Sequence, residues 1–432
     1  SWSIHDAAEL EGRGVATVVL GTDEFSSLAR AEALARGLPH LPLVTVPHPI
    51  GGMEPDSVRA KATLVVEEVI QALTTTPALP AAGEGSEDAE TPTAPEDPDR
   101  LQVWVLERGW GDGLPVLPPT PERVRTLLAG TRRDPNEVVA VLPPRLGEAT
   151  IRALAINAAL AGALPHHLPV IIAAIEAVAD PAFNLQAVQT TTHPCSPLLI
   201  VNGPLAATLG IAGGAGALGS GHRANATIGR AVRLILQNVG GARPGREDRA
   251  TLGHPGKYAY CLAENEAASP WEPLHVERWF DGTASTVTVC ASEAPHNVND
   301  HGSTTGQGIA TTLAGTAATV GLNNVYLEGE PLFVLGPEHA RTVARDGWSK
   351  ADLKRALFAV ARVPLSRFSD ENRERFAVLR PHWFEGAAPE TMVPIAAAWE
   401  DLMVIVAGGA GKHSAFIPTF GRTRSVTRAI GE

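Results

Sequence analysis

The sequence is poor in cysteine. Three cysteines in 432 residues cannot form a disulfide framework, and their scarcity is typical of proteins in a reducing compartment. The first residues also lack a basic segment followed by an apolar one, so we expect no secretory signal. No apolar run approaches the roughly 18–20 residues of a transmembrane helix. These absences predict a cytoplasmic protein without a membrane partner.

Positive charge is also scarce, since 35 Lys and Arg residues face 47 Asp and Glu residues and the formal net charge is −12. Such a balance argues against a nucleic-acid partner. Seven of the acidic residues lie in residues 77–99, which hold no basic residue and five prolines. We interpret this segment as a disordered linker. Subtracting its seven charges from −12 leaves −5 for the rest of the chain, which does not exclude a small anionic substrate.

The chain alternates short β-branched runs with helical patterns, and the order predicts an α/β fold. A 44% hydrophobic share is ample for a sizeable core. The expected strands are 15–20, 43–46, 198–202, 258–262, 286–291, 332–335 and 402–406. The expected helices include 26–36, 57–73, 100–110, 148–163, 167–179, 227–238 and 306–320, together with one capped by Ser349 and Asp352.

Four parts follow from this pattern. Residues 1–76 form a small βαβα, Rossmann-like unit, 77–99 the linker, 100–330 a main α/β domain that holds the expected active site, and 331–432 a C-terminal α/β subdomain. No repeat of about 20–50 residues is visible, which excludes solenoids and propellers. The first unit is undersized, so we expect it to pack on the rest of the chain or on a second subunit, and we expect a homodimer.

The first candidate catalytic pair is His193 and Cys195 in the stretch Thr190-Thr-Thr-His-Pro-Cys. A nearby imidazolium lowers the pKa of a thiol, so this pair could supply a nucleophile and its base. Pro194 favours the extended backbone that points both side chains the same way. The alternative is that Cys195 is a small core residue and His193 a turn cap. Cys261 and Cys290, inside expected strands, are interpreted as core residues.

A glycine-rich run, 210–221, leads into a helix that carries Arg223, Asn225 and Arg230. Glycine permits close approach of a ligand, and a helix start offers free N–H groups, so the run could bind a phosphate or carboxylate. The alternative is tight packing between loop and helix. The glycines do not follow a strand directly, which excludes a dinucleotide fingerprint. A second glycine run, 408–411 before Lys412, departs from the phosphate-loop spacing and could contact an anion.

Side chains suited to acid–base chemistry or to orienting a substrate then gather at expected strand ends. They are His254, Lys257, Glu264, His296 and Asn297. A metal site built from His193, His254, His296 and His301 is the alternative, but no pair of them has a spacing typical of metal ligands. We therefore predict no metal ligands and no required cofactor.

Several long stretches resemble the UGSC-type (seleno)protein family. They are GWGDGLPVLPPTPERV, TTTHPCSPLLIVNGP, RANATIGRAVRLILQNVGGARPG, TLGHPGKYAYCLAENEAASPWEPLHVER and VIVAGGAGKHSAFIP. With them, the resemblance extends over nearly the whole chain after the linker. The unit before the linker also looks like the small α/β domain of this family. The resemblance implies a cysteine or selenocysteine followed by Gly-Ser-Cys after the first strand of that domain.

This chain departs from the family pattern at that place. It reads Gly21-Thr-Asp-Glu-Phe-Ser-Ser27, and no cysteine precedes residue 195. The thiol or selenol redox role that the family name implies therefore cannot be performed there. Peroxidase and disulfide-reductase activities are in doubt for the same reason.

Together these features predict an enzyme that acts on a small anionic substrate, such as a carboxylate or an amino-acid derivative, by lyase or hydrolase chemistry in catabolism or specialised metabolism. The expected catalytic residues are His193, Cys195, His254 and Glu264. The expected substrate-binding residues are Asn202, Arg223, Asn225, Arg230, Lys257, His296 and Asn297. The alternatives are a non-catalytic ligand-binding or scaffold protein derived from a redox family, and a metal-dependent hydrolase.

Overall fold

The computed structural model describes residues 2–74 and 93–431. The greater part of the expected linker, residues 77–92, lies outside the described residues. Its last two residues begin a helix, because Asp97 caps α4 (Pro98–Glu107) by accepting a hydrogen bond from the backbone N–H of Arg100 at 2.9 Å. The expected linker, residues 77–99, thus overlaps this helix at Pro98 and Asp99.

The N-terminal unit is built on two parallel strands, as expected, with a helix before them that the sequence pattern did not predict. The crossover helix between the strands packs against both, which is the arrangement of a βαβ unit. The first strand begins four residues later than predicted, because residues 15–18 form no ladder. The elements are α1 (Trp2–Gly12), β1 (Val19–Thr22), the short helix η1 (Asp23–Phe25), α2 (Ser26–Ala35), β2 (Leu43–Val46) and α3 (Pro55–Thr74).

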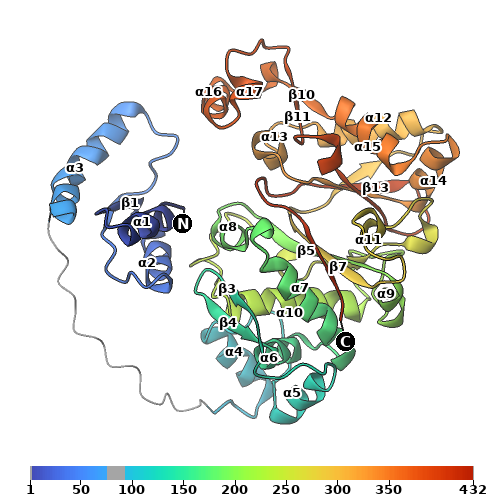
Figure 1. Ribbon diagram of the computed structural model, residues 1–432, viewed down its shortest axis with the longest axis horizontal. Coiled ribbons are helices and arrows are strands. Elements are labelled where there is room, and N and C mark those ends of the chain that lie inside the picture. Colours follow the sequence, from blue (N-terminus) through green and yellow to red (C-terminus); the bar gives the residue numbers. More distant parts are fainter. Residues whose placement is uncertain (1, 75–92, 432) are drawn as a thin grey trace.

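Two four-stranded sheets form the centre of the larger body, which is an α/β fold as predicted (Figure 1). The first sheet has the order β14 (Val426–Ala429), β7 (Thr286–Ser292), β5 (Ser196–Asn202) and β6 (Cys261–Ala263). The second has the order β12 (Met403–Val406), β9 (Leu332–Leu335), β13 (His413–Ile417) and β8 (His296–Asn299). The side chains along β5 alternate between its two faces and show how the two sheets stack. Leu198 and Ile200 pack against the second sheet, whereas Leu199 and Val201 pack against helices.

The layers are therefore helices, sheet, sheet, helices. One outer core joins the first sheet to α6 (Ile151–Ala161), α7 (Leu168–Val178) and α10 (Arg223–Asn238). The other joins the second sheet to α12 (Gly306–Ala317), α14 (Pro337–Arg345) and α15 (Lys350–Val360), where Ser349 and Asp352 form the predicted capping box. Further elements are α5 (Pro121–Leu128), α8 (Leu185–Thr190), α9 (Pro204–Thr208), α11 (Leu274–Glu277), α13 (Asn323–Leu327), α16 (Asp370–Leu379), α17 (Pro381–Phe384) and the hairpins β3 (Val138–Leu142)–β4 (Gly147–Thr150) and β10 (Arg362–Pro364)–β11 (Met392–Pro394).

The two sheets repeat one topology with exchanged fourth strands. In each sheet the first two strands, β6 and β5 or β12 and β9, are parallel, and each of the next two runs antiparallel to the strand beside it. A Gly-Pro pair follows the central parallel strand, at Gly203 after β5 and at Gly336 after β9. β8 comes directly after β7 in the chain but joins the second sheet, and β14 comes after β13 but joins the first. Strands thus cross the expected boundary at residue 330 in both directions.

Candidate functional site

The predicted site residues fall into separate groups. His193 and Cys195 precede β5, and Asn202 is its last residue. At about 3.3 Å per residue the strand is about 20 Å long. No small substrate can therefore contact both ends, and the prediction of one site containing all of these residues needs correction.

A cavity of about 450 Å³ lies beside the N-terminal end of β5. It is lined by the predicted residues His254 and Lys257 and by residues that the sequence analysis did not single out. The loop 250–253 that forms one wall is tied to the segment of His193, because the backbone N–H of Thr251 donates to the carbonyl of Thr192 at 2.9 Å. The full lining is Asp112, Arg233, Gln237, Pro244, Gly245, Asp248, Ala250, Leu252, Gly253, His254, Pro255, Lys257 and Tyr258.

Two cations share one carboxylate in this cavity. Lys257 donates to Oδ2 of Asp248 at 2.6 Å, and a guanidinium nitrogen of Arg233 lies 3.4 Å from the same oxygen. Arg233 also donates to the side-chain oxygen of Gln189 at 3.2 Å, and only 6% of it is exposed. The other carboxylate in the wall, Asp112, is neutralised by two 2.7 Å bonds from Arg230. With Lys257 protonated, the group formed by Arg233, Lys257 and Asp248 carries a net positive charge, which favours an anionic ligand.

The pKa of Lys257 is lowered, first by burial and then by the neighbouring Arg233, while Asp248 opposes both effects. A lysine in this environment can release and recover a proton more readily than a surface lysine. Arg233 was missed because it lies on the mostly apolar buried face of α10, where a sequence pattern cannot tell a buried cation from a surface one.

His254 has both ring nitrogens engaged. Its Nδ1 accepts from the backbone N–H of Gly256 at 3.1 Å, and its Nε2 donates to the carbonyl of Ser292 at 3.2 Å. Burial lowers its pKa. The side chain therefore caps the short helix η4 (Pro255–Lys257) as a neutral imidazole, and a role in proton transfer would require it to break one of these bonds.

Cys195 is 1% exposed, and burial raises the pKa of its thiol to about 12. The nearby Lys257 lowers this pKa only in part. A thiol with this pKa stays protonated at neutral pH, which argues against the nucleophile and favours the core interpretation. Cys261 and Cys290 are buried in strands with equally raised pKa values of about 12.

His193 forms a pair with a carboxylate that the sequence analysis did not name. Its Nε2 lies 2.8 Å from Oε1 of Glu293, and its ring stacks on Phe420 with centroids 4.9 Å apart. Its Nδ1 is buried without a hydrogen-bond partner. The carboxylate and the ring of Phe420 therefore fix the orientation of the imidazole.

At the other end of β5, Asn202 and Glu264 form a buried polar network. Asn202 Nδ2 donates to Glu264 Oε2 at 2.7 Å and to Glu266 Oε1 at 2.9 Å. Burial raises the pKa of Glu264, which is 5% exposed. Glu264 Oε2 also accepts from the backbone N–H of Leu274 at 2.8 Å, so these residues connect β5, the end of β6 and the start of α11, away from the charged cavity.

The remaining predicted ligands are held by other protein groups. Asn225 closes the glycine run, since its amide exchanges two hydrogen bonds with the backbone of Ala212 at 2.8 and 3.0 Å. Arg223 donates to the carbonyl of Gly162, and Arg230 is paired with Asp112. The two glycine runs pack on one another, because Gly408 N–H donates to Gly213 O at 2.8 Å. These contacts favour the packing interpretation of the first run.

His296 and Asn297 lie on β8 in the second sheet and are exposed. Asn297 Oδ1 is 3.0 Å from Nδ1 of His413, whose Nε2 is 3.3 Å from that of His301. Within residues 2–74 and 93–431, no three His, Cys, Asp or Glu side chains are grouped so that they could hold a metal ion. In the same residues, no helix is long and apolar enough to cross a membrane.

The N-terminal unit touches the body next to the charged cavity. Arg249, adjacent to Asp248, lies 3.6 Å from Glu24 and 5.1 Å above the ring of Phe25. Gln186 in α8 donates to Glu32 in α2 at 2.6 Å, and Figure 1 shows the N-terminal unit on this side of the body. The segment Gly21–Ser27, where the resemblance implies a cysteine or selenocysteine, thus faces the body.

Comparisons with known proteins agree with the N-terminal part of the resemblance. The family model of the UGSC family matches residues 1–75. The stretches after the linker that suggested the same family lie outside that match. Neither the curated proteins nor the solved structures include a match to the chain. Over residues 1–75, the α/β unit at the start of this chain is thus similar to the UGSC family.

Proposed function

We propose that this protein is an enzyme that acts on a small anionic substrate, a carboxylate or an amino-acid derivative, in the cavity of Arg233, Asp248 and Lys257. The observation that carries the proposal is the sharing of one carboxylate, Asp248, by two largely buried cations. An incoming anion can take the place of part of the Asp248 interaction without leaving any charge unpaired. Arg233 would then hold the anion, and Lys257 would hold it or carry a proton.

Proton transfer of the lyase or hydrolase type needs only side chains that the cavity contains. Burial and the neighbouring Arg233 lower the pKa of Lys257, so this lysine releases a proton more readily than an exposed one. His193, which is paired with Glu293, is the second candidate and lies on the adjoining segment, outside the cavity lining. In this proposal Cys195, His254 and Glu264 have structural roles.

The test is an NMR screen in D₂O of small carboxylates and amino acids, with their uncharged amides as matched compounds. The wild-type protein should bind at least one carboxylate and not its amide, and should exchange or consume a carbon-bound proton of it. Lys257→Met should slow this reaction by about 100-fold or more. Lys412→Met, which changes a lysine outside the cavity, serves as the control. Failure of every anion to bind, or an undiminished rate in Lys257→Met, would contradict the proposal.

A non-catalytic ligand-binding protein is the second candidate. It is favoured by the two hydrogen bonds that occupy the ring of His254 and by the burial of Cys195. Binding of a carboxylate without exchange or turnover in the same screen would favour it. The expected cytoplasmic homodimer belongs to the proposal as well, and analytical ultracentrifugation of the full chain tests its oligomeric state.

A further inference from the structure

A pair of histidines lies at one edge of the second sheet. Strands β8, β9 and β12 of this sheet run in the same direction, because β12 is parallel to β9 and β13 is antiparallel to both β8 and β9. His301 follows the carboxyl end of β8, and His413 begins β13 opposite Asn299, the last residue of β8. Ligands of open α/β sheets bind outside the carboxyl ends of parallel strands, so a ligand site is expected at this edge.

The two imidazole rings face each other through the same ring atom. Nε2 of His301 lies 3.3 Å from Nε2 of His413, and the ring centroids are 5.1 Å apart. Two Zn–N bonds of about 2.0–2.1 Å at a tetrahedral angle place the two nitrogens about 3.3–3.4 Å apart and the ring centroids about 5.2 Å apart. In a straight hydrogen bond of the same N···N length, the centroids would be about 5.6 Å apart. The pair therefore has the spacing of two ligands on one metal ion.

Asn297 determines which nitrogen of His413 can bind a metal. Its Oδ1 lies 3.0 Å from Nδ1 of His413, and an amide oxygen only accepts hydrogen bonds, so Nδ1 carries the proton. Nε2 of the neutral ring then has a free lone pair, and metal-binding histidines typically donate their other N–H to an oxygen in this way. Both histidines are exposed, so an ion can reach Nε2 from solvent, and His301 can exchange its ring proton with water.

Hydrogen bonds hold the backbone around the pair. Asp300 donates its N–H to the carbonyl of Lys412 at 3.4 Å, and its carbonyl accepts from Nε2 of the buried His339 at 3.0 Å. The carboxylate of Asp300 accepts from the N–H of Ser303 at 2.9 Å and from the hydroxyl of Thr312 at 2.7 Å. The segments that carry the two histidines are thus tied together, and binding an ion does not require a loop to become ordered.

Two carboxylates and one ammonium group lie next to the pair. Asp300 directly precedes His301 in the chain, and Glu338 accepts from the backbone N–H of Gly411 at 2.7 Å. Lys412 opposes them, since its ammonium group donates to the carbonyl of His301 at 3.2 Å. Among these three groups the negative charges outnumber the positive one, which favours a cation.

We propose that Nε2 of His301 and Nε2 of His413 bind one divalent transition-metal cation, such as Zn²⁺, Cu²⁺ or Ni²⁺, with Asn297 as the positioning residue. Imidazole nitrogens select these ions over Mg²⁺ and Ca²⁺, which prefer oxygen ligands. Within the part of the chain that the structure describes, no third His, Cys, Asp or Glu side chain completes a metal-binding group. The site therefore keeps coordination positions open for water or for a donor atom of a small molecule, and it binds more weakly than a closed structural zinc site.

This site is separate from the charged cavity. It lies on the second sheet, whereas the charged cavity lies beside β5 in the first. No spacing rule relates His301 to His413, because the two meet only through the pairing of β8 with β13. Failure of the carboxylate screen would leave the metal site standing, and failure of metal binding would leave the proposed function standing.

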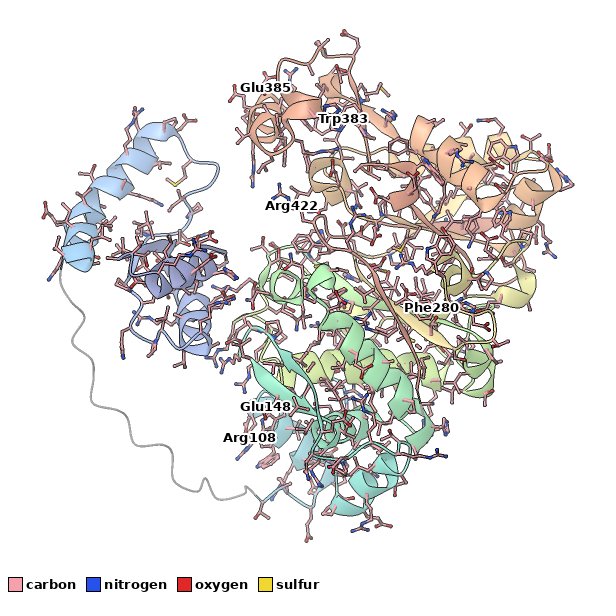
Figure 2. The ribbon with its side chains drawn as sticks, viewed as in Figure 1. Arg108, Glu148, Phe280, Trp383, Glu385 and Arg422 are labelled. Carbon is pink, nitrogen blue, oxygen red and sulfur yellow. The ribbon has the colours of Figure 1, made fainter. Side chains whose placement is uncertain are left out.

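Calorimetric titration of the chelator-treated full chain with Zn²⁺ at neutral pH tests the proposal. The wild-type protein should bind Zn²⁺ at one site with micromolar affinity and should not bind Mg²⁺ there. His301→Gln and His413→Gln should each abolish this binding, because each leaves a single imidazole. The control is His382→Gln, which alters an exposed histidine of α17 and should leave the affinity unchanged. Figure 2 shows its neighbour Trp383 apart from the position of α14 in Figure 1.

Two variants of Asn297 test its positioning role. Asn297→Asp keeps an oxygen acceptor for Nδ1 of His413 and should bind Zn²⁺ at least as tightly as the wild type. Asn297→Leu removes the acceptor and should weaken binding by about tenfold or more. Unchanged affinity in Asn297→Leu would overturn the role of Asn297.

Absence of Zn²⁺ binding in the wild-type protein would overturn the site, and so would binding that survives in a folded His301→Gln or His413→Gln variant. Circular dichroism of each variant establishes that it is folded. A measurement on the unaltered protein decides the question if a variant does not fold. In ¹⁵N-labelled wild-type protein, Zn²⁺ should shift the Nε2 resonances of His301 and His413, and unshifted resonances would overturn the site as well.

Discussion

Nζ of Lys257 lies 2.6 Å from Oδ2 of Asp248, in a cavity where Arg233 approaches the same oxygen. This bond is the main support for the charged form of Lys257, because burial and Arg233 both lower its pKa. The state of the lysine thus depends on a residue nine positions away that no spacing rule identifies.

Asp248→Asn should lower the pKa of Lys257 further, by about 1–3 units, because it removes an opposite charge within hydrogen-bond distance. The chain has five lysines, so ¹³C NMR after reductive methylation can follow each of them through a pH titration. Lys61, which donates to the carbonyls of Pro47 and Pro49 in the N-terminal unit, is the internal control. An unchanged or higher pKa of Lys257 in the variant would show that Asp248 does not stabilise its charge.

The three thiols should be unreactive in the folded protein. All are buried, and burial raises each pKa to about 12, so almost no thiolate exists at pH 8. Ellman's reagent should detect no thiol in the native protein within minutes and three after denaturation. Rapid reaction of one thiol in the native state, lost in Cys195→Ala, would restore Cys195 as a nucleophile.

Local features of the fold were predictable, whereas features set by tertiary contact were not. β-branching identified β5 and β7, and the Ser349–Asp352 spacing identified a helix start, because these signals lie within a few residues. The exchange of β8 and β14 between the sheets has no local signature, because the residue pattern of either strand is compatible with either sheet.

The same distinction between local features and tertiary contacts applies to the candidate site. His254 and Lys257 were found because they are close in sequence to each other and to glycine and proline. Arg233 and Asp248 come to Lys257 only through the packing of α10 and the loop 245–253. The role of Cys195 depended on its burial, which the sequence left open and which the adjoining helices and sheet decide.

His167 should make the protein less stable in mild acid. It is 1% exposed, and burial, with His166 and Arg223 nearby, lowers its pKa from 6.5 to about 4. Between these values the unfolded chain binds a proton that the folded protein does not, so the free energy of unfolding falls as the pH falls below 6.5. The contribution is about 2 kcal/mol between pH 7 and pH 5. Urea denaturation at the two pH values measures it.

His167→Asn should lose this part of the pH dependence, because asparagine does not titrate and can still accept from the backbone N–H of Leu164, as Nδ1 of His167 does at 3.2 Å. His296→Asn, at an exposed position, should behave like the wild-type protein. The assignment to His167 is wrong if His167→Asn loses as much stability between pH 7 and pH 5 as the wild type.

Glu32 places a carboxylate in the contact between the N-terminal unit and the body. It is 1% exposed, its Oε1 accepts from Gln186 at 2.6 Å, and its Oε2 is buried without a partner. Burial is the largest cause of its raised pKa, which means that the contact disfavours the ionised form present at neutral pH.

Glu32→Gln keeps an acceptor for Gln186 and removes the charge, so it should strengthen the contact between the N-terminal unit and the body. Hydrogen exchange in α8 at pH 7 should slow by about fivefold or more. The matched variant Glu68→Gln, on the exposed face of α3, should leave exchange in α8 unchanged, and faster exchange in Glu32→Gln would show that the carboxylate holds the two parts together.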